Sequence, residues 1–364
     1  MIKKALQSIL RKPILRLSDR FASKPDQLRV YKALSKLYEN ILLQKENKGI
    51  IIDAEMQVVK KYIIFSDQHK GVKDGADDFR NAEPVYLSAL DYYFKENYFY
   101  INLGDSEELW ENKIFNVSLK NKANFEKEKL FIDAQRYIKI FGNHDVFWRN
   151  DPLSALMLKL IFGTTFPIYE GALLKCKTEK GSLDFFLTHG HQGDNMSDGN
   201  WFSAWFIANV WAPLQSYLDI NSNTPSNSSD LKTKHNSMMY DWSATQKHLV
   251  LITGHTHQPV FNSLTHLERL YLRLYMAKQK GNADEIKAFE NELINRKMEY
   301  PSNEIDFSKI KNSYFNTGCC CFSDGDITGI EIDTTHIRLI KWSDDGNNFK
   351  REVLEENKLE NLLS

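Results

Sequence analysis

Five polar clusters in this sequence combine aspartate, asparagine and histidine, the side chains that bind divalent metal ions. Each directly follows a short apolar run: Ser66-Asp67-Gln68-His69, Gly104-Asp105, Gly142-Asn143-His144-Asp145, Thr188-His189-Gly190-His191 and Gly254-His255-Thr256-His257. Imidazole suits zinc, iron and nickel, whereas carboxylate and amide oxygens suit manganese and other harder ions. Because two ions held close together need a bridging carboxylate and several neutral ligands, this mixed set predicts a binuclear metal site.

The predicted ligands form two overlapping sets that share Asp105 as the bridge. One ion would be held by Asp67, His69, Asp105 and His257, and the other by Asp105, Asn143, His189 and His255. Taken alone, Asn143 would more often be a turn residue, and His255 a loop histidine. Such separate explanations leave open why every predicted core strand ends in a potential ligand, so the metal site is favoured.

The elements that must position these residues are short buried strands. Runs rich in β-branched and aromatic residues occupy 62–65, 98–101, 137–140, 185–187 and 249–252, and the stretches between them are long enough for helices. Open α/β sheets place functional groups at the carboxyl ends of their strands. Residues 327–342 alternate apolar and polar side chains, as a half-buried β-hairpin would.

The ordered motifs resemble the calcineurin-like metallophosphoesterase superfamily over residues from about 58 to 342, two insertions excluded. The resemblance implies an α/β fold, a four-layer α-β-β-α sandwich of two packed mixed sheets with helical insertions and an N-terminal helical extension. The expected division is a helical, basic amphipathic extension (1–57), a metallophosphoesterase domain (58–345) and a C-terminal tail (346–364). Within the domain, 195–246 reads as a tryptophan-rich cap and 263–299 as a helical hairpin.

The resemblance also implies a mechanism and further site residues. Two divalent ions, with manganese expected first and iron, zinc or cobalt as alternatives, would present a bridging hydroxide that attacks phosphorus in line. His144 is not a ligand in the family pattern; it would stabilise developing charge or protonate the leaving group. The family often has an aspartate three residues after the Gly-Asp aspartate to orient this histidine, and Glu108 stands there. Asp145 is grouped with them as catalytic, and His191 is taken as a neighbour of ligand His189 that contacts substrate.

Several residues also restrict the expected class of substrate. No arginine occurs in residues 104–110, which argues against the phosphoprotein phosphatases. Gly-Asp-x-x-Glu followed by an aromatic residue is similar to the UDP-diacylglucosamine diphosphatases, although those enzymes commonly carry arginine where this chain has His144. Trp201, Trp205 and Trp211 would line an apolar cleft for acyl chains or a nucleobase, or else form the core of the insertion. A small or lipid-linked phosphodiester or pyrophosphate is expected.

Charge and composition weigh on the alternatives. Lys plus Arg (47) nearly equal Asp plus Glu (48), which disfavours a nucleic-acid partner and hence a manganese-dependent nuclease with the same motifs. A non-catalytic scaffold would typically have lost ligands.

Residues 1–24 form a basic amphipathic segment that would contact a membrane surface or pack on the enzyme body. No apolar run reaches the ~20 residues of a membrane span, and no signal-peptide pattern is present, so a cytoplasmic, optionally membrane-peripheral, protein is expected. The four cysteines read as reduced, partly buried thiols, and the oligomeric state is left unassigned.

Overall fold

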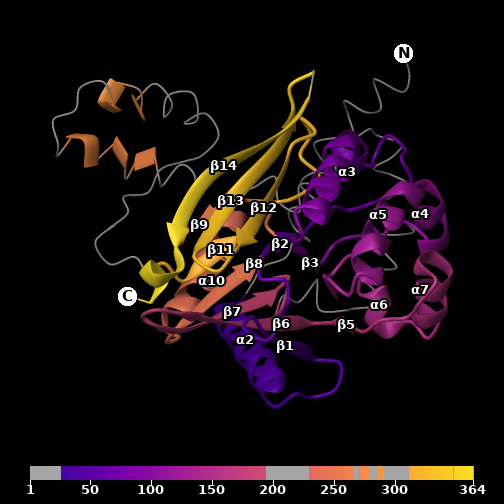
Figure 1. Ribbon diagram of the computed structural model, residues 1–364, viewed down its shortest axis with the longest axis horizontal. Helices are drawn as coiled ribbons and strands as arrows, with labels where there is room; N and C mark the ends of the chain where they lie inside the picture. The colour runs from indigo at the N-terminus through magenta and orange to yellow at the C-terminus, as the bar shows by residue number, and fades with distance from the viewer. Residues whose placement is uncertain are drawn as a thin grey trace.

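Two mixed β-sheets pack face to face and carry helices on their outer faces (Figure 1). This computed structural model describes residues 26–193, 229–265, 311–346 and 348–363, with scattered residues between 270 and 290. Within that part of the chain each sheet has seven strands. The helices found there include none that is both long and apolar enough to cross a membrane.

The first sheet has the strand order β1-β6-β7-β8-β11-β9-β10. Its strands are β1 (Gly49–Asp53), β6 (Gly171–Thr178), β7 (Gly181–Thr188), β8 (Leu249–Thr253), β11 (Tyr314–Asn316), β9 (Val260–Phe261) and β10 (Leu264–Thr265). Strands β7, β8 and β11 run parallel, with Leu187 opposite Ile252 and Ile252 opposite Phe315. The carboxyl ends of β7 and β8 therefore lie at one edge.

The second sheet has the order β14-β13-β12-β2-β3-β4-β5. Its strands are β14 (Phe349–Lys358), β13 (His336–Asp344), β12 (Ile327–Ile332), β2 (Tyr62–Phe65), β3 (Phe99–Leu103), β4 (Tyr137–Ile140) and β5 (Ile168–Tyr169). Strands β2, β3 and β4 are parallel, with Ile64 opposite Ile101 and Ile101 opposite Ile138. Three of the predicted clusters thus emerge from neighbouring strand ends.

The helices are α2 (Gln27–Leu42), α3 (Phe79–Lys95), α4 (Ile114–Lys120), α5 (Lys122–Asp133), α6 (Phe147–Asn150), α7 (Ser154–Phe162), α10 (Ser229–Ala244) and the 3-10 turn η3 (Leu359–Leu362). Helix α2 begins at Asp26, whose carboxylate accepts the Arg29 N–H at 2.9 Å and so satisfies one unpaired amide of the first turn. Its buried residues Val30, Leu34, Leu37 and Ile41 recur at helical spacing and pack, with α10, on the first sheet.

Three apolar layers hold the elements together. The central layer lies between the sheets and includes Ile64 and Ile101 from one and Leu187 and Val250 from the other. A second layer joins α3 to the outer face of the second sheet, and a third joins α2 and α10 to the first sheet. This arrangement confirms the expected four-layer α-β-β-α sandwich.

The predicted strands at 62–65, 98–101, 137–140, 185–187 and 249–252 correspond to β2, β3, β4, β7 and β8, and the hairpin at 327–342 to β12 and β13. The expected limits of the domain are wrong at both ends. Residues 49–53, placed in the helical extension, form β1 because their three consecutive isoleucines pair with β6. Residues 349–358, expected as a tail, form β14 along β13, and the mostly polar, exposed residues of this edge strand obscured it in the sequence.

The insertions are described only in part. Of the predicted cap, helix α10 lies in the described residues, and its Trp242 is buried against Phe186 rather than placed over the strand ends. The predicted hairpin at 263–299 begins with strand β10 and has scattered helical residues between 270 and 290. Trp201, Trp205 and Trp211 lie outside the described residues, as does the basic segment 1–24.

Candidate metal centre

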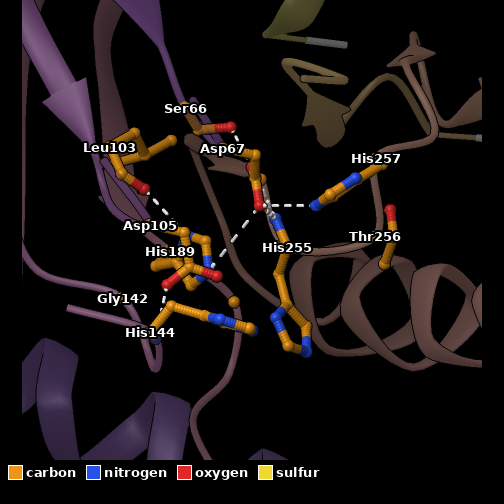
Figure 2. A network of polar contacts seen from close by, with 12 residues as sticks. Ser66, Asp67, Leu103, Asp105, Gly142, His144, His189, His255, Thr256 and His257 are labelled. Carbon is orange, nitrogen blue, oxygen red and sulfur yellow. Dashed lines mark hydrogen bonds and ion pairs between the residues drawn. The ribbon is translucent and has the colours of Figure 1, made fainter. Parts of the chain in front are cut away.

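The predicted ligands converge where strand ends of both sheets meet (Figure 2). Asp67 and His69 follow β2, Asp105 follows β3 and Asn143 follows β4, whereas His189 follows β7 and both His255 and His257 follow β8. Apart from the half-buried His255, these side chains are buried, so any charge they carry is held away from water.

One group of donors surrounds Asp67. Its Oδ1 lies 3.2 Å from His257 Nε2, and His69 Nε2 lies 3.2 Å from the same nitrogen. Asp105 Oδ2 is 3.8 Å from His69 Nε2. Two imidazole nitrogens at this separation require a proton or a cation near them, because their lone pairs would otherwise repel.

A second group surrounds His189. Its Nε2 lies 3.0 Å from Asp105 Oδ2, and its Nδ1 lies 2.9 Å from the Leu103 carbonyl oxygen. Since only a protonated Nδ1 can donate to a carbonyl, Nε2 keeps its lone pair for a metal. His255 completes this group, with one nitrogen within 4.8 Å of the Asp105 and His189 atoms. Asp105 therefore adjoins both groups.

The arrangement passes a direct test for divalent cations. Asn143 Oδ1 is buried and has no hydrogen-bond partner among the described residues, although an amide oxygen normally finds one. Two carboxylates and four imidazoles point their donor atoms into the same small volume. Such a set of nitrogen and oxygen donors matches divalent transition metals.

The electrostatics keep the carboxylates ionised. Burial alone would raise the pKa of Asp105, but His189 and His144 lower it well below its usual range. Burial would likewise raise the pKa of Asp67, yet His189 and His257 hold it low. In turn, Asp105 and Asp67 overcome the burial of His189 and raise its pKa to about 9. Both aspartates therefore stay ionised and available to a cation.

The backbone at the centre is strained. Positive φ angles occur at five predicted ligands, namely Asp67 (52°), His69 (50°), Asp105 (49°), His255 (70°) and His257 (56°). Such conformations cost about 1–3 kcal/mol each for residues other than glycine, and they cluster at functional sites. Gly142 has a related role, since a Cβ at this position would collide with the Asp105 carboxylate. The glycine in Gly-Asn-His-Asp is therefore required by close approach.

Glu108 connects the metal ligands to His144. Its Oε1 and Oε2 lie 2.9 and 2.8 Å from His144 Nδ1, and Oε2 also lies 2.9 Å from His69 Nδ1. Trp110, the aromatic residue of the motif, stacks on the His144 ring with centroids 4.0 Å apart and an interplanar angle of 17°, a contact that the sequence did not predict. Its Nε1–H donates to the Asn143 carbonyl oxygen at 2.6 Å. The aromatic residue in Gly-Asp-x-x-Glu-x-aromatic thus fixes the ring of His144.

Two further predicted site residues, Asp145 and His191, lie buried beside the donor groups. Asp145, grouped as catalytic, is fully buried and accepts the backbone N–H groups of Gly142 (2.6 Å) and Ser106 (2.9 Å). It is therefore a positioning residue that joins the loops after β3 and β4. His191, expected to contact substrate, is buried with its ring centroid 5.5 Å from that of His189, and burial lowers its pKa to about 3.

A buried ion network beneath the centre also escaped the sequence analysis. Glu107 lies 2.9 Å from Lys139 Nζ and 3.3 Å from Lys70 Nζ, and all three side chains are fully buried. Burial would raise the pKa of Glu107, but Lys139 and Lys70 lower it to about 2. The available signal was a lysine inside the apolar run Tyr-Ile-Lys-Ile at 137–140.

Two cysteines border the opposite side of His257. Cys321 Sγ lies 3.8 Å from His257 Nδ1, and Cys319 belongs to the same group of donor atoms within 4.8 Å. Burial would raise the pKa of Cys319, but a hydrogen bond with Cys321 and the nearby His257 lower it to about 6. All four cysteines are free in the structure, and they are buried where partial burial was expected.

Comparison with known proteins adds one strong match. The model of the calcineurin-like phosphoesterase family matches residues 60–259, more than half of the chain. No curated protein sequence matches significantly. Among solved structures, a dimetal phosphatase from Danio rerio is 8% identical, with 83% of this chain and 98% of that chain covered and a TM-score of 0.37. Vacuolar protein sorting 29 from Cryptosporidium parvum is 10% identical, with 82% and 98% covered and a TM-score of 0.31. TM-scores this low carry no conclusion.

Proposed function

This chain belongs to the calcineurin-like phosphoesterase family, and we propose that it hydrolyses a phosphodiester or pyrophosphate with two divalent ions. The proposed substrate is small or lipid-linked. Asp67, His69 and His257 would hold one ion, and Asn143, His189 and His255 the other. Manganese is the proposed metal, because the donor set mixes imidazoles with carboxylate and amide oxygens.

One observation carries the two-ion proposal: Asp105 adjoins both donor groups. The same carboxylate oxygen, Oδ2, lies 3.0 Å from His189 Nε2 and 3.8 Å from His69 Nε2. Its other oxygen, Oδ1, accepts the His144 N–H at 2.8 Å, which fixes the carboxylate between the loops after β3 and β4. A carboxylate held in this way can serve two cations at once.

When bound, two such ions lower the pKa of a water molecule and neutralise charge on the phosphoryl oxygens. The residues of this chain supply the proton for the leaving group. His144 presents Nδ1 to Glu108, so Nε2 is the atom free to face the substrate. As an imidazolium stabilised by the Glu108 carboxylate, His144 would donate its Nε2 proton to the departing oxygen. Trp110 keeps the ring in this orientation.

The proposed substrate class depends on what the loop after β3 offers. Residues 104–110 contain no arginine for a phosphomonoester dianion, and Glu108 instead places a carboxylate beside His69 and His144. A diester or pyrophosphate has fewer charges per phosphorus and a leaving group that benefits from a proton donor such as His144. A nuclease is less well supported, because basic and acidic residues balance (47 against 48).

The test is a substrate panel with matched variants. Bis(p-nitrophenyl) phosphate, p-nitrophenyl phosphate, nucleotide-sugar pyrophosphates, a lipid-linked nucleotide pyrophosphate and single-stranded DNA would be offered with Mn²⁺, while bound metal is measured by mass spectrometry. We expect diester or pyrophosphate cleavage, loss of both ions in Asp105→Ala, and retained ions with lost turnover in His144→Ala. Preferred cleavage of monoesters or DNA would refute the substrate class, and a fully active, metal-loaded Asp105→Ala protein would refute the site.

A further inference from the structure

Helices α4 and α7 lie side by side at one end of the molecule (Figure 1). Their inner faces share one buried apolar cluster, to which α4 contributes Ile114 and Val117 and α7 contributes Leu158 and Phe162. This cluster satisfies the packing needs of both short helices. Apolar side chains on their other faces are therefore surplus to the fold.

The outer faces nevertheless carry large apolar side chains. On α4 these are Phe115 (58% exposed) and Leu119 (63%), four residues apart. Along α7 and its first turn they are Leu153 (59%), Leu156 (53%) and Leu160 (66%), at spacings of three and four residues. Helical spacing aligns each set on one face. We call these five residues the α4/α7 apolar surface.

The charged residues within the two helices have a single sign, and Asp151, which precedes α7, accepts the Leu153 N–H at 2.8 Å. Lys113, Lys120 and Lys159 are exposed beside the apolar residues. Neither helix contains an aspartate or glutamate, as the sequences IFNVSLK and SALMLKLIF show. Helices with exposed apolar residues and with lysine as their only charged residue are typical of the interface of an anionic membrane, where apolar groups enter the acyl boundary and lysines meet lipid phosphates.

We propose that the α4/α7 apolar surface docks on an anionic lipid bilayer. Other occupants of the surface fit less well. The segment 1–24 of this chain has seven basic residues and one acidic residue, so lysines would face lysines and arginines. A second copy of the same surface would bring like charges together in the same way. A bilayer with anionic headgroups complements both components of the surface.

The docking helices are continuous in the chain with the loops of the metal centre. The loop that holds Glu108 and Trp110 leads into α4, and the loop that holds Asn143 and His144 leads through α6 into α7. Both catalytic loops therefore connect directly to the docking helices. If the proposed hydrolysis is correct, the substrate is a phosphodiester or pyrophosphate carried by a membrane lipid; this consequence rests on the proposed function, whereas docking itself does not.

The experiment measures co-sedimentation of the full chain with vesicles of phosphatidylcholine alone or mixed with phosphatidylglycerol. Variants Leu156→Glu/Leu160→Glu and Phe115→Glu/Leu119→Glu add charge to positions that are already in water, so folding should be preserved. The matched control is Met56→Glu/Val58→Glu, at residues that are 79% and 97% exposed elsewhere on the chain. Turnover of bis(p-nitrophenyl) phosphate reports the metal centre separately.

We expect the parent and the control to bind anionic vesicles, and both surface variants to lose affinity by at least about tenfold with turnover of the soluble diester unchanged. Equal sedimentation of all four proteins, or none for the parent, would overturn the docking proposal. A dimer that the variants dissociate without lipid would assign the surface to self-association instead. Normal docking without diester turnover in the parent would leave docking intact and contradict the proposed function.

Discussion

Glu108 Oε1 lies 2.9 Å from His144 Nδ1, and this pairing determines which nitrogen of His144 can meet a substrate. The other oxygen of the same carboxylate lies 2.9 Å from His69 Nδ1. Burial would raise the pKa of Glu108, but His144 and His69 lower it to about 2, so the group stays ionised. One carboxylate thereby orients a metal ligand and the proposed proton donor together.

Replacing Glu108 should therefore separate turnover from metal binding. Glu108→Gln keeps the size of the side chain but loses the charge that stabilises an imidazolium. We expect kcat to fall by roughly 10–100-fold, with a smaller loss of bound metal, as is usual for a group that orients a ligand. The measurements are kcat with saturating Mn²⁺ and metal content after dialysis.

Glu108→Asp is the conservative comparison. Its side chain is shorter by one methylene and cannot reach both Nδ1 atoms without a backbone shift. We therefore expect Glu108→Asp to recover part of either kcat or the metal content, but not both. Wild-type kcat in the Gln variant would show that the carboxylate does not act on His144.

Trp110→Ala should lower kcat more than Trp110→Phe does. Alanine removes both the stacking on His144 and the hydrogen bond to the Asn143 carbonyl, whereas phenylalanine removes only the hydrogen bond. Each interaction contributes about 0.5–1.5 kcal/mol, so the alanine variant should lose up to about 100-fold in kcat if the whole effect falls on His144 orientation. Steady-state kinetics check this, and equal kcat in both variants would exclude stacking as the orienting contact.

The sequence predicted the metal ligands better than it predicted the residues that support them. Asp67, Asp105 and Asn143 lie at one edge because they follow parallel strands, which share a direction. Such strands can be predicted from short apolar runs of the sequence. Trp110 and Lys139 could not be assigned in this way. Their partners lie 32 to 34 residues away along the chain, so only the folded structure brings them together.

The edges of the sheets show a similar limit. Strand β14 lies at the edge of its sheet and has mostly exposed, polar residues. It is held by pairing with β13, so its sequence shows little of the apolar-polar alternation that predicts a strand. The orientation of Asp145 could not be predicted for a related reason. A carboxylate beside His144 in the sequence looks catalytic, yet the turn directs it toward the Gly142 and Ser106 amides.

The buried Glu107 should make folding sensitive to acid. Lys139 and Lys70 lower its pKa to about 2 from the usual 4.5, so its stabilisation is present above about pH 4.5 and is lost as the pH falls toward 2. Glu107→Gln should remove this part of the pH dependence. It would leave buried Lys70 with Glu128 alone and buried Lys139 with only Asp145, 3.9 Å away, and should destabilise the protein by up to about 3–5 kcal/mol at pH 7.

Urea unfolding between pH 2 and 7, with EDTA present so that metal loss does not contribute, measures both effects. Glu126→Gln is the matched control, since Glu126 pairs with Lys122 on the surface, where both side chains are mostly exposed, and should change stability by less than about 0.5 kcal/mol. A parent protein whose unfolding free energy is flat from pH 4.5 to 2 would contradict the assignment of Glu107.

Cys319 and Cys321 should support metal binding through His257. Cys321 Sγ lies 3.8 Å from His257 Nδ1, whereas His257 Nε2 faces Asp67 at 3.2 Å. A group at Nδ1 fixes the ring and adjusts the basicity of Nε2, and its removal typically lowers metal affinity by about 10–100-fold. The double variant Cys319→Ser/Cys321→Ser should therefore release one ion more readily than the other during titration with a chelator.

Cys320→Ser is the control, because its equally buried Sγ is directed to the Thr328 carbonyl oxygen, 3.9 Å away. Identical chelator titrations for the parent and the double variant would show that the thiols only fill space beside His257, and equal losses of both ions would point to general loosening of the loop.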